Sequence, residues 1–119
     1  WVLLLHSLPD GTFHHDWMIE RFPGGPLLSF RLAAEINPCA AAEFAAEMVG
    51  DHRREYLEYE GPVSGDRGRV ERVGAGVCEV EIVADLVRIR VAGRELVGRK
   101  FHSGWMFRLA SEPESGHTG

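Results

Sequence analysis

The sequence predicts a mainly β protein: a small antiparallel β-barrel or sandwich with one short helix. Short apolar and β-branched runs recur along the chain, separated by segments rich in glycine, proline, serine or aspartate. The 14 glycines and 6 prolines indicate many turns. Because 119 residues hold one hydrophobic core, we expect a single domain over residues 1–111 and a disordered polar tail over 112–119.

The N-terminal part predicts three strands in succession. Residues 2–6 are a short apolar run, followed by the turn-forming residues 9–11. Residues 12–20 continue with aromatic and branched side chains up to the glycines and prolines at 23–26, and residues 27–32 supply a third strand. We expect the first two strands to form a hairpin.

Residues 38–48 predict the one short helix. The segment is rich in alanine, the strongest helix former, and Glu43 and Glu47 lie one helical turn apart. The helix could extend through residues 51–59, although Gly50 lies where a helix can end.

The second half of the chain predicts five short strands. Their alternating pattern and close spacing are typical of an antiparallel sheet that curls into a barrel or sandwich. They are expected over residues 69–73, 77–83, 87–91, 95–101 and 105–109.

The net charge and the distribution of charged residues limit the classes of protein to which the chain can belong. The net charge of −5 argues against a protein that coats nucleic acids non-specifically, because that affinity comes from Lys and Arg. Between residues 88 and 108, however, basic residues outnumber the single acid, Glu95. They form either a local basic face or solvated outward positions of strands. They are Arg88, Arg90, Arg94, Arg99, Lys100 and Arg108.

The sequence also indicates where in the cell the protein is expected to be. The apolar opening at residues 2–5 is far shorter than the about 20 residues of a membrane helix, so we expect no membrane association and no signal peptide. Cys39 and Cys78 show no metal-like spacing and form no disulfide framework. We therefore expect a cytoplasmic protein.

A histidine and an aspartate on the second predicted strand indicate a metal site. Alternation places His14 and Asp16 on one face of the strand, with His15 and Trp17 on the other. The hairpin can bring His6 across from His14. Two imidazoles and one carboxylate suit a catalytic divalent metal. Alternatively, the histidines lie on half-exposed strand faces and bind nothing.

A second cluster lies at residues 51–56. His52 and Tyr56 are four residues apart and share a face if the segment is helical, so they could contact a phosphate together. Alternatively, the segment is a surface turn with Tyr56 packed on the core. No nucleophile elbow or P-loop accompanies either cluster.

Together these segments resemble the 3′-phosphoesterase module of bacterial DNA ligase D. Phe-His-His-Asp-Trp-Met-Ile-Glu at 13–20 is similar to the family's Leu-His-Tyr-Asp-Phe-Arg-Leu-Glu strand. Residues 51–61 are similar to its Asp-His-Pro-x-x-Tyr-x-x-Phe-Glu-Gly segment. Residues 27–32 and 87–109 resemble further strands, in the same order, so the resemblance spans nearly the whole chain.

The resemblance implies a phosphoesterase, a hydrolase of DNA repair. Its metal ligands would be His6, His14 and Asp16, binding manganese, with zinc or cobalt as alternatives. His52 and Tyr56 would be the catalytic residues that contact the phosphate. Family members remove a 3′-terminal phosphate or ribonucleotide from a DNA or RNA primer strand. A nucleic-acid 3′ end is thus the expected partner, with a repair ligase or polymerase as a second.

One departure from the family keeps a second interpretation open. Met18 stands where the family commonly has an arginine that can hold a phosphate. Arg31, Arg53 or Arg54 could replace that charge. The chain is then either an active phosphoesterase or a noncatalytic module derived from it that binds a metal and nucleic-acid ends. An unrelated β-barrel would require both histidine segments to match by chance.

Overall fold

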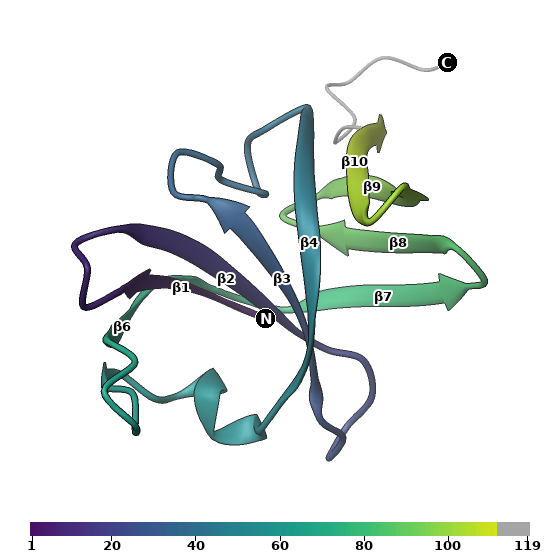
Figure 1. Ribbon diagram of the computed structural model, residues 1–119. Helices are drawn as coiled ribbons and strands as arrows, with labels where there is room; N and C mark the ends of the chain where they lie inside the picture. The colour runs from purple at the N-terminus through teal and green to yellow at the C-terminus, as the bar shows by residue number, and fades with distance from the viewer. Residues whose placement is uncertain (112–119) are drawn as a thin grey trace.

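The computed structural model describes residues 1–111, so the polar tail predicted over residues 112–119 lies outside the described part. It confirms a mainly β, antiparallel protein (Figure 1). Within the described residues, no helix has the length and apolar character needed to cross a membrane. The elements are β1 (Val2–Ser7), β2 (Phe13–Glu20), β3 (Leu27–Ala33), β4 (Glu43–His52), the 3₁₀ turn η1 (Arg54–Leu57), β5 (Gly61–Pro62), β6 (Arg69–Ala75), β7 (Cys78–Val83), β8 (Leu86–Val91), β9 (Arg94–Phe101) and β10 (Gly104–Ser111).

The ten strands form one sheet in the order β5-β6-β1-β2-β3-β4-β10-β9-β8-β7. Strand β4 belongs to both halves, because its first residues pair with β10 and its last residues pair with β3. Figure 1 shows β1, β2 and β3 on one side of β4, and β7 to β10 on the other. Over residues 1–111, β5 and β7 are the two ends of the strand order, so the sheet folds over like a sandwich without closing as a barrel.

The main core lies between the two halves of the sheet. Four aromatic rings occupy its centre, and the centroid of Phe107 lies 5.1 Å from Phe30, 5.2 Å from Phe44 and 5.8 Å from Trp17. Such packing stabilises a core beyond the buried area alone. Gly98 on β9 makes room for it, because a Cβ there would lie 2.5 Å from the ring of Phe107.

A second, smaller core lies on the opposite face of β1, β2 and β3. It contains the buried side chains of Val2, Leu4, Met18, Leu27 and Val70. Residues of η1 and the segment after it cover this cluster: Tyr56, Leu57 and Val63. The strands β1 to β3 are therefore covered on both faces.

The strands expected from alternation are confirmed, but the helix predicted over residues 38–48 is wrong. Residues 43–52 form β4, in which Phe44 and Ala46 are buried while Glu43, Ala45 and Glu47 are exposed. This period of two, with hydrogen-bonded partners in β3 and β10, outweighs the helix propensity of alanine, which amounts to about 0.7 kcal/mol or less per residue. The described helical turn, η1, comes after β4.

Candidate metal centre

The β1–β2 hairpin places the predicted ligands on one face. His6 is the direct cross-strand partner of His14, and Asp16 follows two residues later on β2. The predicted alternation is confirmed, because Trp17 lies in the main core and His15 Nδ1 lies 2.8 Å from the carbonyl oxygen of Ile36.

The three side chains converge at hydrogen-bonding distance. Asp16 Oδ2 lies 3.2 Å from His6 Nδ1, and Asp16 Oδ1 lies 3.1 Å from His14 Nε2. One ligand atom from each of the three residues lies within 4.8 Å of the other two. Asp16 is 4% exposed, and the two histidines are half-buried. This cluster, His6, His14 and Asp16, is called the metal cluster below.

The hydrogen bonds of the metal cluster suit a cation. His6 Nε2 donates to the carbonyl oxygen of Arg67 at 2.7 Å, which in the neutral imidazole leaves the lone pair of Nδ1 directed at Asp16. Within residues 1–111, the buried atoms His14 Nε2 and Asp16 Oδ1 lie 3.1 Å apart without the geometry of a hydrogen bond, and neither has another hydrogen-bond partner. Buried polar atoms without partners are costly, and a divalent ion would satisfy them. The donor set therefore fits a metal.

The protonation state of His14 also favours metal binding. Burial lowers the pKa of His14 below its ordinary value; Arg31 and His6 add to this effect, while Asp16 opposes it. The neutral imidazole, which is the form that binds a metal, is therefore favoured at neutral pH.

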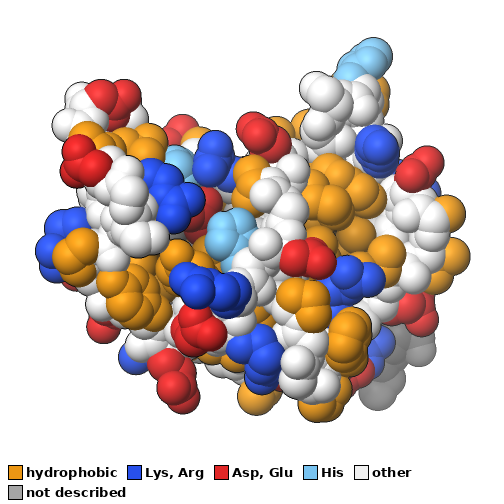
Figure 2. Space-filling model, turned by 60° about the horizontal axis from the view of Figure 1, so that its bottom comes forward, with side chains coloured by type: hydrophobic (Ala, Val, Ile, Leu, Met, Phe, Trp, Pro, Cys, Tyr) orange, Lys and Arg blue, Asp and Glu red, His pale blue; other side chains and the backbone are white. Residues whose placement is uncertain are grey.

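One arginine borders the metal cluster. Arg31 on β3 is the cross-strand partner of Asp16, and its Nε lies 3.8 Å from Asp16 Oδ1. In the space-filling view, histidine surface lies next to the blue of Lys and Arg side chains (Figure 2). An anion at the metal cluster would therefore meet a positive charge.

The structure pairs His52 with Tyr56 and places them on the face of the sheet that carries the metal cluster. Their ring centroids are 5.7 Å apart, and Tyr56 packs against the second core. His52 pairs with Leu27 on β3, four residues from Arg31. His52 Nδ1 is buried and has no partner in the described part of the chain.

The other candidate phosphate contacts are engaged or distant. Met18 is 1% exposed in the second core, so it lines no open site. Arg54 forms an ion pair with Glu20, and the exposed Arg53 lies 3.5 Å from Glu55. Of the three arginines that could replace the missing family charge, Arg31 is the one beside the metal cluster.

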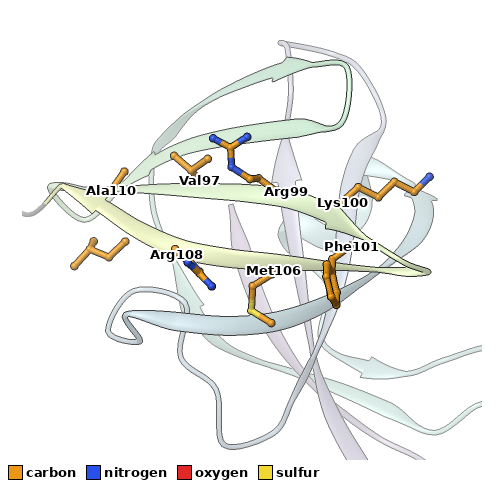
Figure 3. Close-up of a pocket in the computed structure, with 8 residues that line it drawn as sticks. Val97, Arg99, Lys100, Phe101, Met106, Arg108 and Ala110 are labelled. Carbon is orange, nitrogen blue, oxygen red and sulfur yellow. The ribbon is translucent and has the colours of Figure 1, made fainter.

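The basic residues of the C-terminal half are divided among several roles. Arg94 is buried and donates to the carbonyl oxygens of Pro38 and Ala41. Exposed ion pairs within 4 Å join Arg88 and Arg90 to Glu95. The others line a shallow groove of about 570 Å³ on the outer face of β9 and β10 (Figure 3), formed by Val97, Arg99, Lys100, Phe101, Met106, Arg108, Leu109 and Ala110.

The chain matches no known protein-family pattern, and no curated protein sequence matches it. The resemblance to the phosphoesterase module thus stays a prediction. One feature of the site escaped sequence analysis: the carbonyl oxygen of Arg67, which holds His6. The Arg67 contact joins residues 61 positions apart, and no local pattern signals it.

Proposed function

We propose that this protein is a metal-dependent phosphoesterase that acts on phosphorylated 3′ ends of nucleic acids in DNA repair, in the cytoplasm. The observation that carries the proposal is the convergence of His6, His14 and Asp16 with buried ligand atoms that have no other partner. The order of the two histidine segments, similar to that of the phosphoesterase module, supports the substrate class.

The residues on this face of the sheet would have different roles. His6, His14 and Asp16 would hold a divalent ion, most readily Mn²⁺, with Zn²⁺ or Co²⁺ as alternatives. When bound, such an ion polarises a phosphoryl oxygen and lowers the pKa of a water molecule. The carbonyl of Arg67 fixes the tautomer of His6. His52 and Tyr56, on the same face of the sheet, would hold another part of the nucleic acid.

A noncatalytic module that binds a metal and nucleic-acid ends is the second candidate. It is favoured by the burial of Met18 at the family's arginine position. It is also favoured by the position of His52, which pairs with Leu27, four residues along β3 from Arg31, because a catalytic proton donor must reach the reacting phosphate. Such a module would serve a repair ligase or polymerase.

Release of phosphate from a 3′-phosphorylated primer on a template separates the two candidates. We expect release with Mn²⁺, none with chelator, and loss of release and of Mn²⁺ binding in His14→Ala. The matched control is His15→Ala, which removes the neighbouring histidine on the opposite face and should keep Mn²⁺ binding.

Two outcomes would change the proposal. Mn²⁺ binding without phosphate release would support the noncatalytic module. Equal Mn²⁺ binding by His14→Ala and the wild type would show that the metal cluster is not the metal site.

A further inference from the structure

Arg31 is placed to act on whatever binds at the metal cluster. Its position on β3, opposite Asp16, fixes its side chain on the same face as His14 and Asp16. The contact is a single one: Nε lies 3.8 Å from Asp16 Oδ1, and the side chain is 44% exposed. Within residues 1–111, the guanidinium makes no hydrogen bond and no second ion pair, although Glu47 is its cross-strand partner on β4.

A divalent ion and Arg31 would share one carboxylate oxygen. Asp16 Oδ1 is both a buried atom without a hydrogen-bond partner and the carboxylate oxygen that faces Arg31 at 3.8 Å. With neutral imidazoles, the charges of Asp16 and Arg31 cancel, so the charge of the ion is left uncompensated. Two cations at one carboxylate repel each other unless an anion lies between them.

We propose that Arg31 is the phosphate-holding residue of this site and that it makes the site selective for a terminal phosphate monoester over an internal diester. This inference rests on the proposed function. A monoester carries close to two negative charges at neutral pH, which balances the ion, and its three free oxygens can accept from the planar guanidinium in bidentate fashion. An internal diester carries one charge and offers fewer free oxygens.

Binding measurements test Arg31 apart from catalysis. Calorimetry with Mn²⁺ alone should show about three- to tenfold tighter binding in Arg31→Gln than in the wild type, because a neighbouring positive charge is removed. With Mn²⁺ present, thymidine 3′-monophosphate should bind the variant about tenfold or more weakly. Arg31→Lys should restore part of this affinity, since it keeps the charge and loses the bidentate geometry.

Selectivity gives the second readout. The wild type should prefer thymidine 3′-monophosphate over a thymidine dinucleotide with one internal phosphodiester, and Arg31→Gln should lose most of that preference. Arg99→Gln makes the same change in the groove on β9 and should leave both affinities unchanged. Glu47→Gln, beside Arg31 on β4, should also leave them near the wild-type values.

The failures are distinguishable. If the wild type binds Mn²⁺ but Arg31→Gln binds Mn²⁺ and the monophosphate as the wild type does, the assignment of Arg31 is wrong while the metal site stands. If the wild type binds neither Mn²⁺ nor the monophosphate, both the proposed function and the role of Arg31 are wrong.

Discussion

The two halves of the folded sheet differ in what covers their faces. Strands β1 to β3 pack on the main core with one face and on the second core with the other. Strands β8 and β9 bury one face in the main core, and their other face carries exposed ion pairs such as Arg90–Glu95 and the open groove of Arg99 and Phe101.

Because of this difference, a polar side chain has a different structural significance in the two halves of the sheet. On β8 and β9, a charged side chain facing outward is the ordinary solvated face of an antiparallel strand, and its ion pairs contribute about 0–1 kcal/mol. On β1 and β2, a buried carboxylate is costly unless something satisfies it. Asp16, 4% exposed and 3.1 Å from His14 Nε2, is therefore the position at which we propose a bound cation.

The largest effect is expected from placing a charge in the doubly covered half. Met18→Arg should lower the free energy of unfolding by roughly 3–5 kcal/mol, because it buries an unpaired charge at a position that is 1% exposed. Met48→Arg, at a position that is 39% exposed, should change it by about 0.5 kcal/mol or less. Urea unfolding of both variants measures the contrast. Similar stability in the two would mean that the second core is loosely packed.

Loss of the buried carboxylate should remove the response to metal. Mn²⁺ at about one hundred times its dissociation constant should stabilise the wild type by about 2.7 kcal/mol. Asp16→Asn should abolish this stabilisation while the chain stays folded in chelator, because asparagine has nearly the same size and its side chain can keep the contact with His6. Thermal unfolding with Mn²⁺ and with chelator is the measurement. Unfolding of the variant in chelator would instead assign Asp16 a structural role.

The alternation of apolar and polar side chains along the sequence predicted most of the strands correctly. It failed at β4, where alanine and glutamate give a helix-like composition and the inward positions hold only Phe44 and Ala46. What makes this segment a strand is its partners, β3 and β10, and these come from sequence positions on both sides of it. A local pattern carries no information about such partners.

The candidate site likewise combines contacts that a local sequence pattern can predict with contacts that it cannot. The meeting of His6 with His14 could be predicted, because a short hairpin sets their register. The approach of Arg31 to Asp16 depends on the register of β2 against β3, which the sequence analysis did not predict. The helix expected to align His52 and Tyr56 does not form, yet the end of β4 and the turn η1 bring their rings to 5.7 Å.

A smaller effect tests the interface between the two halves. Gly98→Ala should lower the free energy of unfolding by about 1–3 kcal/mol, because its Cβ would meet the ring of Phe107 at 2.5 Å and displace it from the aromatic cluster. Gly74→Ala, where the nearest atom is 3.2 Å away in the ring of Trp1, should cost less. Denaturant unfolding compares the two variants. Equal costs would show that the main core yields around Phe107.

The smallest effect concerns the thiols at the margin of the main core. Burial raises the pKa of Cys39 and of Cys78, so the folded state favours the neutral thiols. Their contribution to stability is present below the unfolded pKa of about 8.5 and is lost as the pH rises through the higher folded pKa. Because the thiolate is the reactive form, an aromatic disulfide reagent at pH 8 should react more slowly with the folded protein than with the protein in urea. Equal rates would show that the margin of the core, where both cysteines pack, opens readily to solvent.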